Sequence, residues 1–380
     1  MTEEPKTSTS THRQQAIFWL TLSLVGIAFA CFILWLVYFR YHESTDDAYT
    51  SGDKVNLTTV VAGTPIAFFA DNNDLVEEGQ LLVLFDDTYY RLSYEKELQT
   101  LASTAMQVRQ LYAAVEANLA AVEVKAIIQK NAQYDFENRK RLVSSKGVSQ
   151  EEYTHSESHL KSTDGDLAQA KAQLKMAVDA VGQTPFESHP LLLKQIAVVK
   201  EAYYFLKHCV VKAPVTGYVA QRSVQVGQWV PLNAHMLSII PLNTMWIDAN
   251  FKETQLAKMR IGQPADVVID YYGSDVKFKG IVQGIGFGTG SVFAIIPPQN
   301  ATGNWIKIVQ RLPVRITLDP DEIKKYPLRL GLSTYVNVNI SNTDLPMIAP
   351  KAAVKPVAMT GVFDVDFRVV DQAISEALKK

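Results

Sequence analysis

The sequence is poor in cysteine and has no marked excess of charge of either sign, and both features exclude classes of function. Its 380 residues contain two cysteines, Cys31 and Cys209, whose separation fits no metal-binding or redox motif. The 37 basic and 39 acidic side chains leave a net charge of -2, which removes the electrostatic reason to expect a nucleic acid partner. We therefore expect neither a disulfide framework, nor a thiol redox site, nor DNA binding.

Long hydrophobic runs are also scarce, and the single one stands near the start of the chain. Residues 16–39 read AIFWLTLSLVGIAFACFILWLVYF and carry no charge. As a helix they would span roughly 36 Å, which exceeds the roughly 30 Å of a bilayer's hydrocarbon core. Trp19 near one end, and Trp35, Tyr38 and Phe39 near the other, are typical of aromatic belts. Because the run is too long for a signal peptide and lacks an A-x-A exit, we predict a transmembrane helix.

The charges around this segment do not decide its orientation. Lys6 and Arg13 precede it, and Arg40 and Lys54 follow it, so the basic residues are nearly balanced. The short polar head, residues 1–15, is expected to stay in the cytoplasm while the long remainder is exported. Since one span cannot form a transport pathway, the chain needs a transporter as a membrane partner.

Two short segments far apart in the chain resemble each other and predict a split β module. Residues 50–87 contain Gly63 and a V-x-x-G-Q turn, and residues 208–242 contain the run Ala213-Pro214-Val215-Thr216-Gly217 followed by a V-G-Q turn. Each segment has a glycine at its start, an alternating strand and a turn into a closing strand. Two copies of one β unit indicate a pseudo-symmetric, lipoyl-like sandwich whose halves are separated in sequence.

Between these halves, residues 88–207 have the periodicity of a helical hairpin. The seam positions of the first limb include Tyr94, Leu101, Val108, Val115 and Val122, with Leu98, Ala105, Tyr112, Leu119 and Ala126 as companions. Leu160, Leu167, Leu174 and Val181 repeat at the same seven-residue step on the returning limb. Gly147 is expected to end the first helix in a left-handed conformation, and Ser149 to cap the second with Glu152. The pattern predicts an antiparallel coiled coil with limbs of roughly 85 Å.

Two further stretches carry a family resemblance. They are Trp246–Leu256, reading WIDANFKETQL, and residues 290–315, which include PPQNATGNWIK and VQRLPVR. With the anchor, the split lipoyl-like halves and the inserted hairpin, they resemble the membrane fusion proteins of the HlyD type, most closely the EmrA-type adaptors. The resemblance covers about residues 16–342. The motif residues within these stretches are Asn250, Phe251, Lys252, Glu253, Asn300, Gly303, Trp305 and Arg311.

The resemblance implies a multidomain α+β fold with an N-terminal transmembrane helix, a split lipoyl-like β-sandwich, a long inserted antiparallel coiled-coil hairpin and a C-terminal β-barrel. The barrel is expected over residues 243–342. Residues 343–380 form a tail outside the resemblance, in which prolines are typical of a linker before a short amphipathic end.

The resemblance also implies a function as a periplasmic adaptor, anchored by a single pass in the bacterial inner membrane. Such adaptors join an inner-membrane transporter, here one of the major facilitator type, to an outer-membrane channel of the TolC type for export of drugs or toxic compounds. They act as homo-oligomers. An alternative is an adaptor for secretion of a polypeptide or an envelope molecule, which the residues do not separate from drug export.

Adaptors that meet such channels often carry an R-x3-L-x6-S pattern at the hairpin tip. Leu142 and Ser149 match this spacing, but Asn138 occupies the arginine position, with Arg139 one residue further on. We therefore predict a channel-contact tip made of Arg139, Leu142, Gly147 and Ser149.

No pattern indicates an enzyme, a cofactor or a metal. The hairpin replaces the lysine-bearing turn of a lipoyl carrier, and His155 and His159, although four residues apart, lack a third ligand. No nucleophile stands with a base. Four barrel aromatics are either a drug-contact surface or, as we favour, core: Phe251, Phe287, Phe293 and Trp305.

Overall fold

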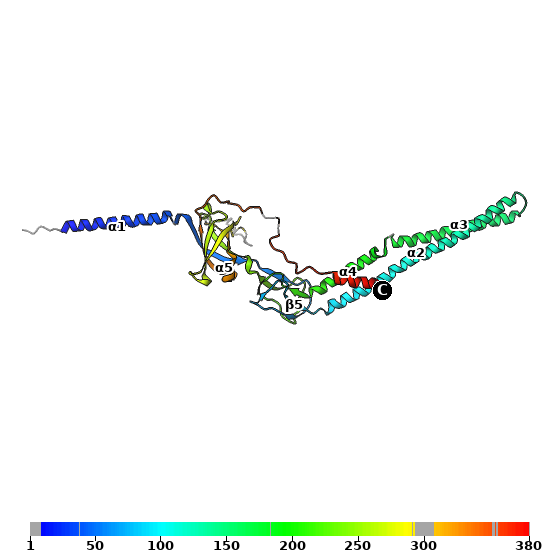
Figure 1. The fold of residues 1–380 in the computed structure, drawn as a ribbon, viewed down its shortest axis with the longest axis horizontal. Coiled ribbons are helices and arrows are strands. Elements are labelled where there is room, and N and C mark those ends of the chain that lie inside the picture. Colours follow the sequence, from blue (N-terminus) through cyan, green and yellow to red (C-terminus); the bar gives the residue numbers. More distant parts are fainter. Residues whose placement is uncertain are drawn as a thin grey trace, which may run out of the picture.

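The computed structural model shows an elongated molecule with its domains in a row (Figure 1). It describes residues 9–37, 39–182, 184–290, 292, 308–351, 354 and 356–379. Helix α1 (Thr9–Val37) lies at one end, followed by a β-barrel, a β-sandwich and a helical hairpin. Within the described residues, only α1 contains a segment long and apolar enough to cross a membrane, Arg13–Ile33, and its side chains are not buried in the protein.

The β-barrel next to α1 closes with a strand that sequence analysis did not find. Its strand order is β1-β13-β10-β11-β12-β9. The bounds are β1 (His42–Gly52), β9 (Met245–Lys252), β10 (Pro264–Ile269), β11 (Lys277–Ile285), β12 (Arg311–Leu318) and β13 (Ser333–Asn339), with a short helix α5 (Pro320–Lys325) before β13. Strand β1 reads HESTDDAYTSG, and its inward side chains include Thr45, Ala48 and Thr50. Because these inward side chains are small and two of them are polar, the segment lacks the alternation of apolar and polar residues from which a strand is predicted.

The sandwich in the middle of the molecule contains strands from both predicted halves. One sheet has the order β2-β8-β7-β4 and the other β3-β5-β6. The bounds are β2 (Val55–Thr58), β3 (Pro65–Phe68), β4 (Leu75–Val76), β5 (Leu81–Phe85), β6 (Val210–Lys212), β7 (Gly217–Ala220) and β8 (His235–Ile240). Each sheet therefore joins segments that are more than 100 residues apart, as expected of a split module. Leu82, Phe85 and Ile239 are fully buried between the sheets.

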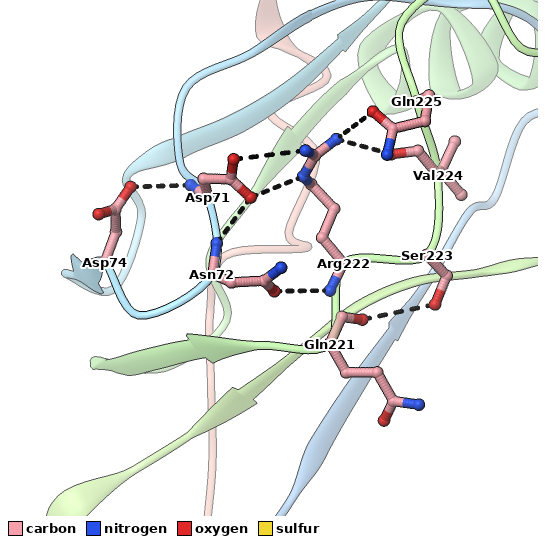
Figure 2. A network of polar contacts seen from close by, with 8 residues as sticks. All are labelled: Asp71, Asn72, Asp74, Gln221, Arg222, Ser223, Val224 and Gln225. Atoms are coloured by element: carbon pink, nitrogen blue, oxygen red, sulfur yellow. Dashed lines mark hydrogen bonds and ion pairs between the residues drawn. The ribbon is translucent and has the colours of Figure 1, made fainter.

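A polar network also joins the two halves of the sandwich (Figure 2). Arg222, from the second half, donates from Nε to Asp71 Oδ1 at 2.9 Å, and its backbone N–H donates to Asn72 Oδ1 at 2.9 Å. The guanidinium lies 5.1 Å from the centroid of the Phe68 ring. Its hydrogen bond lowers the pKa of Asp71, so this carboxylate remains charged near neutral pH.

The hairpin consists of α2 (Thr88–Val143), α3 (Gln150–Val181) and α4 (Pro190–His208). Leu101, Ala105 and Val108 are fully buried in its seam, as the heptads predict. Further along, Leu119 is 48% exposed although the pattern placed it in the seam. A straight α-helix has 3.6 residues per turn, so positions that repeat every seven residues rotate by about 20° per heptad around its axis. After a few heptads such a position no longer faces the other helix of the hairpin. At this level Lys125 and Asp166 form an ion pair of 2.7 Å between α2 and α3.

The C-terminal tail ends in a helix that packs on the base of the hairpin. Helix α6 (Arg368–Lys379) buries Val370 and Ile374 against α2 and α4, and Lys200 pairs with Asp371 at 2.8 Å. Figure 1 shows the extended tail passing from the barrel along the sandwich to this helix. The predicted linker thus connects the barrel to the hairpin, because its amphipathic end packs on the hairpin base. Together α2, α4 and α6 form a three-helix bundle there.

Candidate functional sites at the two ends of the molecule

The hairpin tip is closed by a Schellman turn. The Gly147 N–H donates to the Leu142 carbonyl oxygen at 2.9 Å, and the Lys146 N–H donates to the Val143 carbonyl oxygen at 3.2 Å. In this motif the donor of the inner bond adopts the left-handed conformation, and that residue is Lys146, with a φ of 54°. The prediction that Gly147 is left-handed is wrong, because α2 ends one residue too early for the glycine to reach that position.

The predicted contact residues at the tip have different local roles. The Ser149 hydroxyl accepts from the Glu152 N–H at 3.1 Å, and the Ser149 N–H donates to the Glu152 carboxylate at 2.9 Å. This capping box lowers the pKa of Glu152, chiefly through the backbone hydrogen bond. Leu142 is 47% exposed, and Arg139 is exposed on the same helix. The tip therefore presents an apolar and a cationic side chain, and its contact with a channel stays a prediction.

Changing Lys146 to glycine is expected to stabilise the tip by about 0.5–1 kcal/mol, because glycine avoids the left-handed penalty of a side chain. The amide of Gly147 should then exchange with solvent about two- to fivefold more slowly in hydrogen-exchange measurements. Ser145→Gly is the matched control, since Ser145 has no positive φ and glycine there should accelerate exchange. Equal effects of the two substitutions would contradict the assigned turn.

At the barrel, two of the predicted motif residues meet at a residue that sequence analysis missed. Asn250 donates from Nδ2 to Asp47 Oδ1 at 3.1 Å, and Arg311 pairs with Asp47 Oδ2 at 2.7 Å. Asp47 lies in β1 at an irregularity in its pairing with β13, between Thr45 and Ala48. The network binds the strand that follows the anchor to β9 and β12. No local signal could have identified Asp47, because its partners are 203 and 264 positions away.

Three further motif residues, Phe251, Lys252 and Glu253, also serve the barrel architecture. Phe251 is fully buried in the barrel core, so it offers no surface to a drug. The N–H of Lys252 donates to Gln255 at 3.0 Å, and the N–H of Glu253 donates to the Gln310 carbonyl oxygen at 3.0 Å. Phe287 is 89% exposed, so the favoured prediction that it belongs to the core is wrong. The remaining predicted barrel residues, Asn300, Gly303 and Trp305, lie outside the described residues, as does Phe293.

No group of three or more His, Cys, Asp or Glu side chains in the described part of the chain is arranged to hold a metal ion. His155 lies 3.9 Å from Glu151, one helical turn away on the surface of α3.

Comparison with known proteins identifies two domain families and close relatives. Residues 88–208 match the EMRA alpha-helical hairpin domain, and residues 244–340 match the AAEA-like beta-barrel domain. The multidrug export protein EmrA of Escherichia coli K12 is 39% identical over 93% of this chain and 90% of its own length. The EmrA protein of Haemophilus influenzae is 37% identical over 100% of this chain and 98% of its own length, so the match includes the tail.

A third relative is the fatty acid resistance protein FarA of Neisseria gonorrhoeae, which is 39% identical over 88% of this chain and 85% of its own length. Each of these matches covers at least 88% of the chain and therefore extends over several domains rather than one. This chain belongs to the EmrA family of membrane fusion proteins.

Proposed function

We propose that the chain is the periplasmic adaptor of a multidrug export system and joins an inner-membrane transporter to an outer-membrane channel. The observation that carries this function is the placement of two contact regions at opposite ends of one elongated chain, with α1 at one end and the hairpin tip at the other (Figure 1). Relatives in two organisms are named multidrug export proteins, and a third is named for fatty acid resistance. The role is connecting rather than catalytic.

The inner-membrane partner is proposed to be a transporter of the major facilitator type. Several apolar side chains of α1, among them Leu20, Val25 and Phe29, are more than 60% exposed. They are free to contact lipid and a neighbouring transporter helix. The barrel follows α1 directly, and the Asp47–Arg311 pair fixes the strand that leaves the membrane. This connection supports a position of the barrel beside the membrane.

The distant partner is proposed to be an outer-membrane channel of the TolC type. Helix α2 has 56 residues and therefore extends about 84 Å from the sandwich. Its tip carries the exposed Leu142 next to cationic side chains. An apolar contact surrounded by charge is typical of a protein interface.

A second apolar stripe on α2 supports assembly of several copies. Its exposed members follow an a/d spacing outside the predicted seam: Ala113, Ala117, Ala120, Val124, Ile127 and Tyr134. Beside it, a shallow groove of about 460 Å³ runs between α2 and α3. A side-by-side hairpin of a second copy would cover both features, and we propose that the adaptor is a homo-oligomer.

Crosslinking in cells tests this function. Single cysteines are placed at Ser145 or Gly147 in the tip and at Ala117 in the stripe, in a chain with Cys31→Ser. Cys209 is kept, because it is fully buried and burial raises the pKa of its thiol to about 12. The tip cysteines should crosslink to an outer-membrane channel, and the Ala117 cysteine to other copies of this chain.

Lys171→Cys, on the exposed surface of α3 away from the tip, is the control that should give no channel crosslink. Tip crosslinks only between copies, or none at normal expression, would count against direct channel contact. Channel crosslinks without any at Ala117 would leave the bridging function standing but contradict the proposed hairpin packing.

A further inference from the structure

The sandwich has two free strand edges on the same side, and both line one cavity. Strand β2 is outermost in its sheet, and β6 is outermost in the other. Leu57 of β2 and Val211 of β6 line a cavity of about 410 Å³ together with the C-terminal end of α4. A second cavity of about 500 Å³ adjoins it and shares Leu57, Val60, His208 and Phe363. Each has a volume typical of small-molecule sites, which range from about 300 to 1,000 Å³.

The tail forms one wall of both cavities. Residues 358–366 cross the sandwich without forming a strand. Among the described residues, no backbone hydrogen bond joins this segment to β2 or β6. It is held at one end by a 3.1 Å hydrogen bond from the Thr360 hydroxyl to Glu78, and at the other by the docking of α6. Phe363 lines both cavities, so its ring belongs to the wall of each.

The lining is apolar with a cationic rim. Lys207, Lys212 and His208 line the first cavity. Two carboxylates are also present, but Asp366 is paired with Arg368 at 2.7 Å and is neutralised by it. Apart from the Asp366–Arg368 pair, the lining therefore carries two lysines and one carboxylate, Asp364, and Lys207 also lies 5.2 Å from the centroid of the Tyr203 ring. This combination of apolar walls and excess positive charge is complementary to an amphiphilic anion.

We propose that the cavities beneath the tail bind an amphiphilic anion of the size of a medium-chain carboxylate, with its chain beside Phe363 and its head group at Lys207 and Lys212. The barrel separates this site from α1 (Figure 1), so the ligand reaches it from the aqueous side and not as part of the bilayer. The inference concerns ligand binding to one chain and does not depend on contact with a channel.

Protection of a single cysteine from N-ethylmaleimide tests the site in the full-length chain in lipid nanodiscs. Val60→Cys, in a chain with Cys31→Ser, places the thiol where it lines both cavities. Decanoate at ten times its dissociation constant should slow labelling about tenfold. Decyltrimethylammonium, with the same chain length and opposite charge, should give no protection. Val357→Cys, on the fully exposed part of the same tail, should be protected by neither compound.

The charge requirement is tested with Lys207→Glu/Lys212→Glu, which should weaken decanoate binding by about tenfold or more. Lys171→Glu/Lys175→Glu, a matched double reversal on the exposed surface of α3, should leave it unchanged. The proposal is overturned if decanoate does not protect Val60→Cys, if both amphiphiles protect it equally, or if protection survives the reversal at the cavity.

Discussion

Alanine at Gly217 is expected to destabilise the sandwich by about 3 kcal/mol or more. A Cβ at this position would lie 2.4 Å from the Ile240 carbonyl oxygen and 2.7 Å from the Ile240 carbonyl carbon. These are backbone atoms of the neighbouring strand β8, which cannot rotate away as a side chain could. The strands would have to separate where Tyr218 pairs with Ile240, and the cost of such overpacking is at the upper end of its usual range.

Glycine to alanine in the hairpin is expected to stabilise the protein, whereas the same change at Gly217 destabilises it. Gly165 lies within α3, and a Cβ there meets no atom within 4 Å. Gly165→Ala should stabilise the helix by about 0.5–1 kcal/mol, because alanine loses less backbone entropy on folding. Hydrogen exchange followed by mass spectrometry measures each region separately, which suits a multidomain chain. Unchanged exchange of β7 and β8 in Gly217→Ala would show that the strands are not this close.

Aspartate at Ile374 is expected to release α6 from the hairpin base. Ile374 is 5% exposed and packs with Val370 against residues of α2 and α4, including Leu101 and Val199. The variant loses this apolar burial and places a carboxylate in an apolar contact, which together cost about 3–5 kcal/mol. The ratio of docked to released helix should therefore fall by more than about 100-fold.

Val369→Asp is the matched control, because Val369 is the adjacent apolar position and is 62% exposed. Limited proteolysis of the tail, with hydrogen exchange of α6, distinguishes the two variants. Rapid cleavage near residue 368 is expected for Ile374→Asp only. Equal protection in both variants would mean that α6 does not hold the tail. Released α6 should also weaken decanoate protection at Val60→Cys, because the tail forms one wall of that cavity.

The elements predicted correctly are those with a local signal. The heptads placed the seam of α2 at Leu101, Ala105 and Val108, all of which are fully buried. The capping box at Ser149 was predicted from two residues three positions apart and is present. The left-handed residue of the tip was assigned wrongly, because a shift of one residue in the end of a helix moves the motif from Gly147 to Lys146.

The apolar helix near the start of the chain, the helical hairpin and the two similar β segments could be predicted from the amino acids alone, because each depends on the hydrophobic pattern of a continuous stretch. Three features became visible only in the folded chain: β1 closes the barrel, Asn250 and Arg311 meet at Asp47, and α6 covers the hairpin base. These contacts join segments separated by more than 190 residues, or, for α6, by at least 160 from α4. The local pattern of an amphipathic or small-residue segment indicates which of its faces is buried. Which other segment packs against that face depends on the packing of the whole chain.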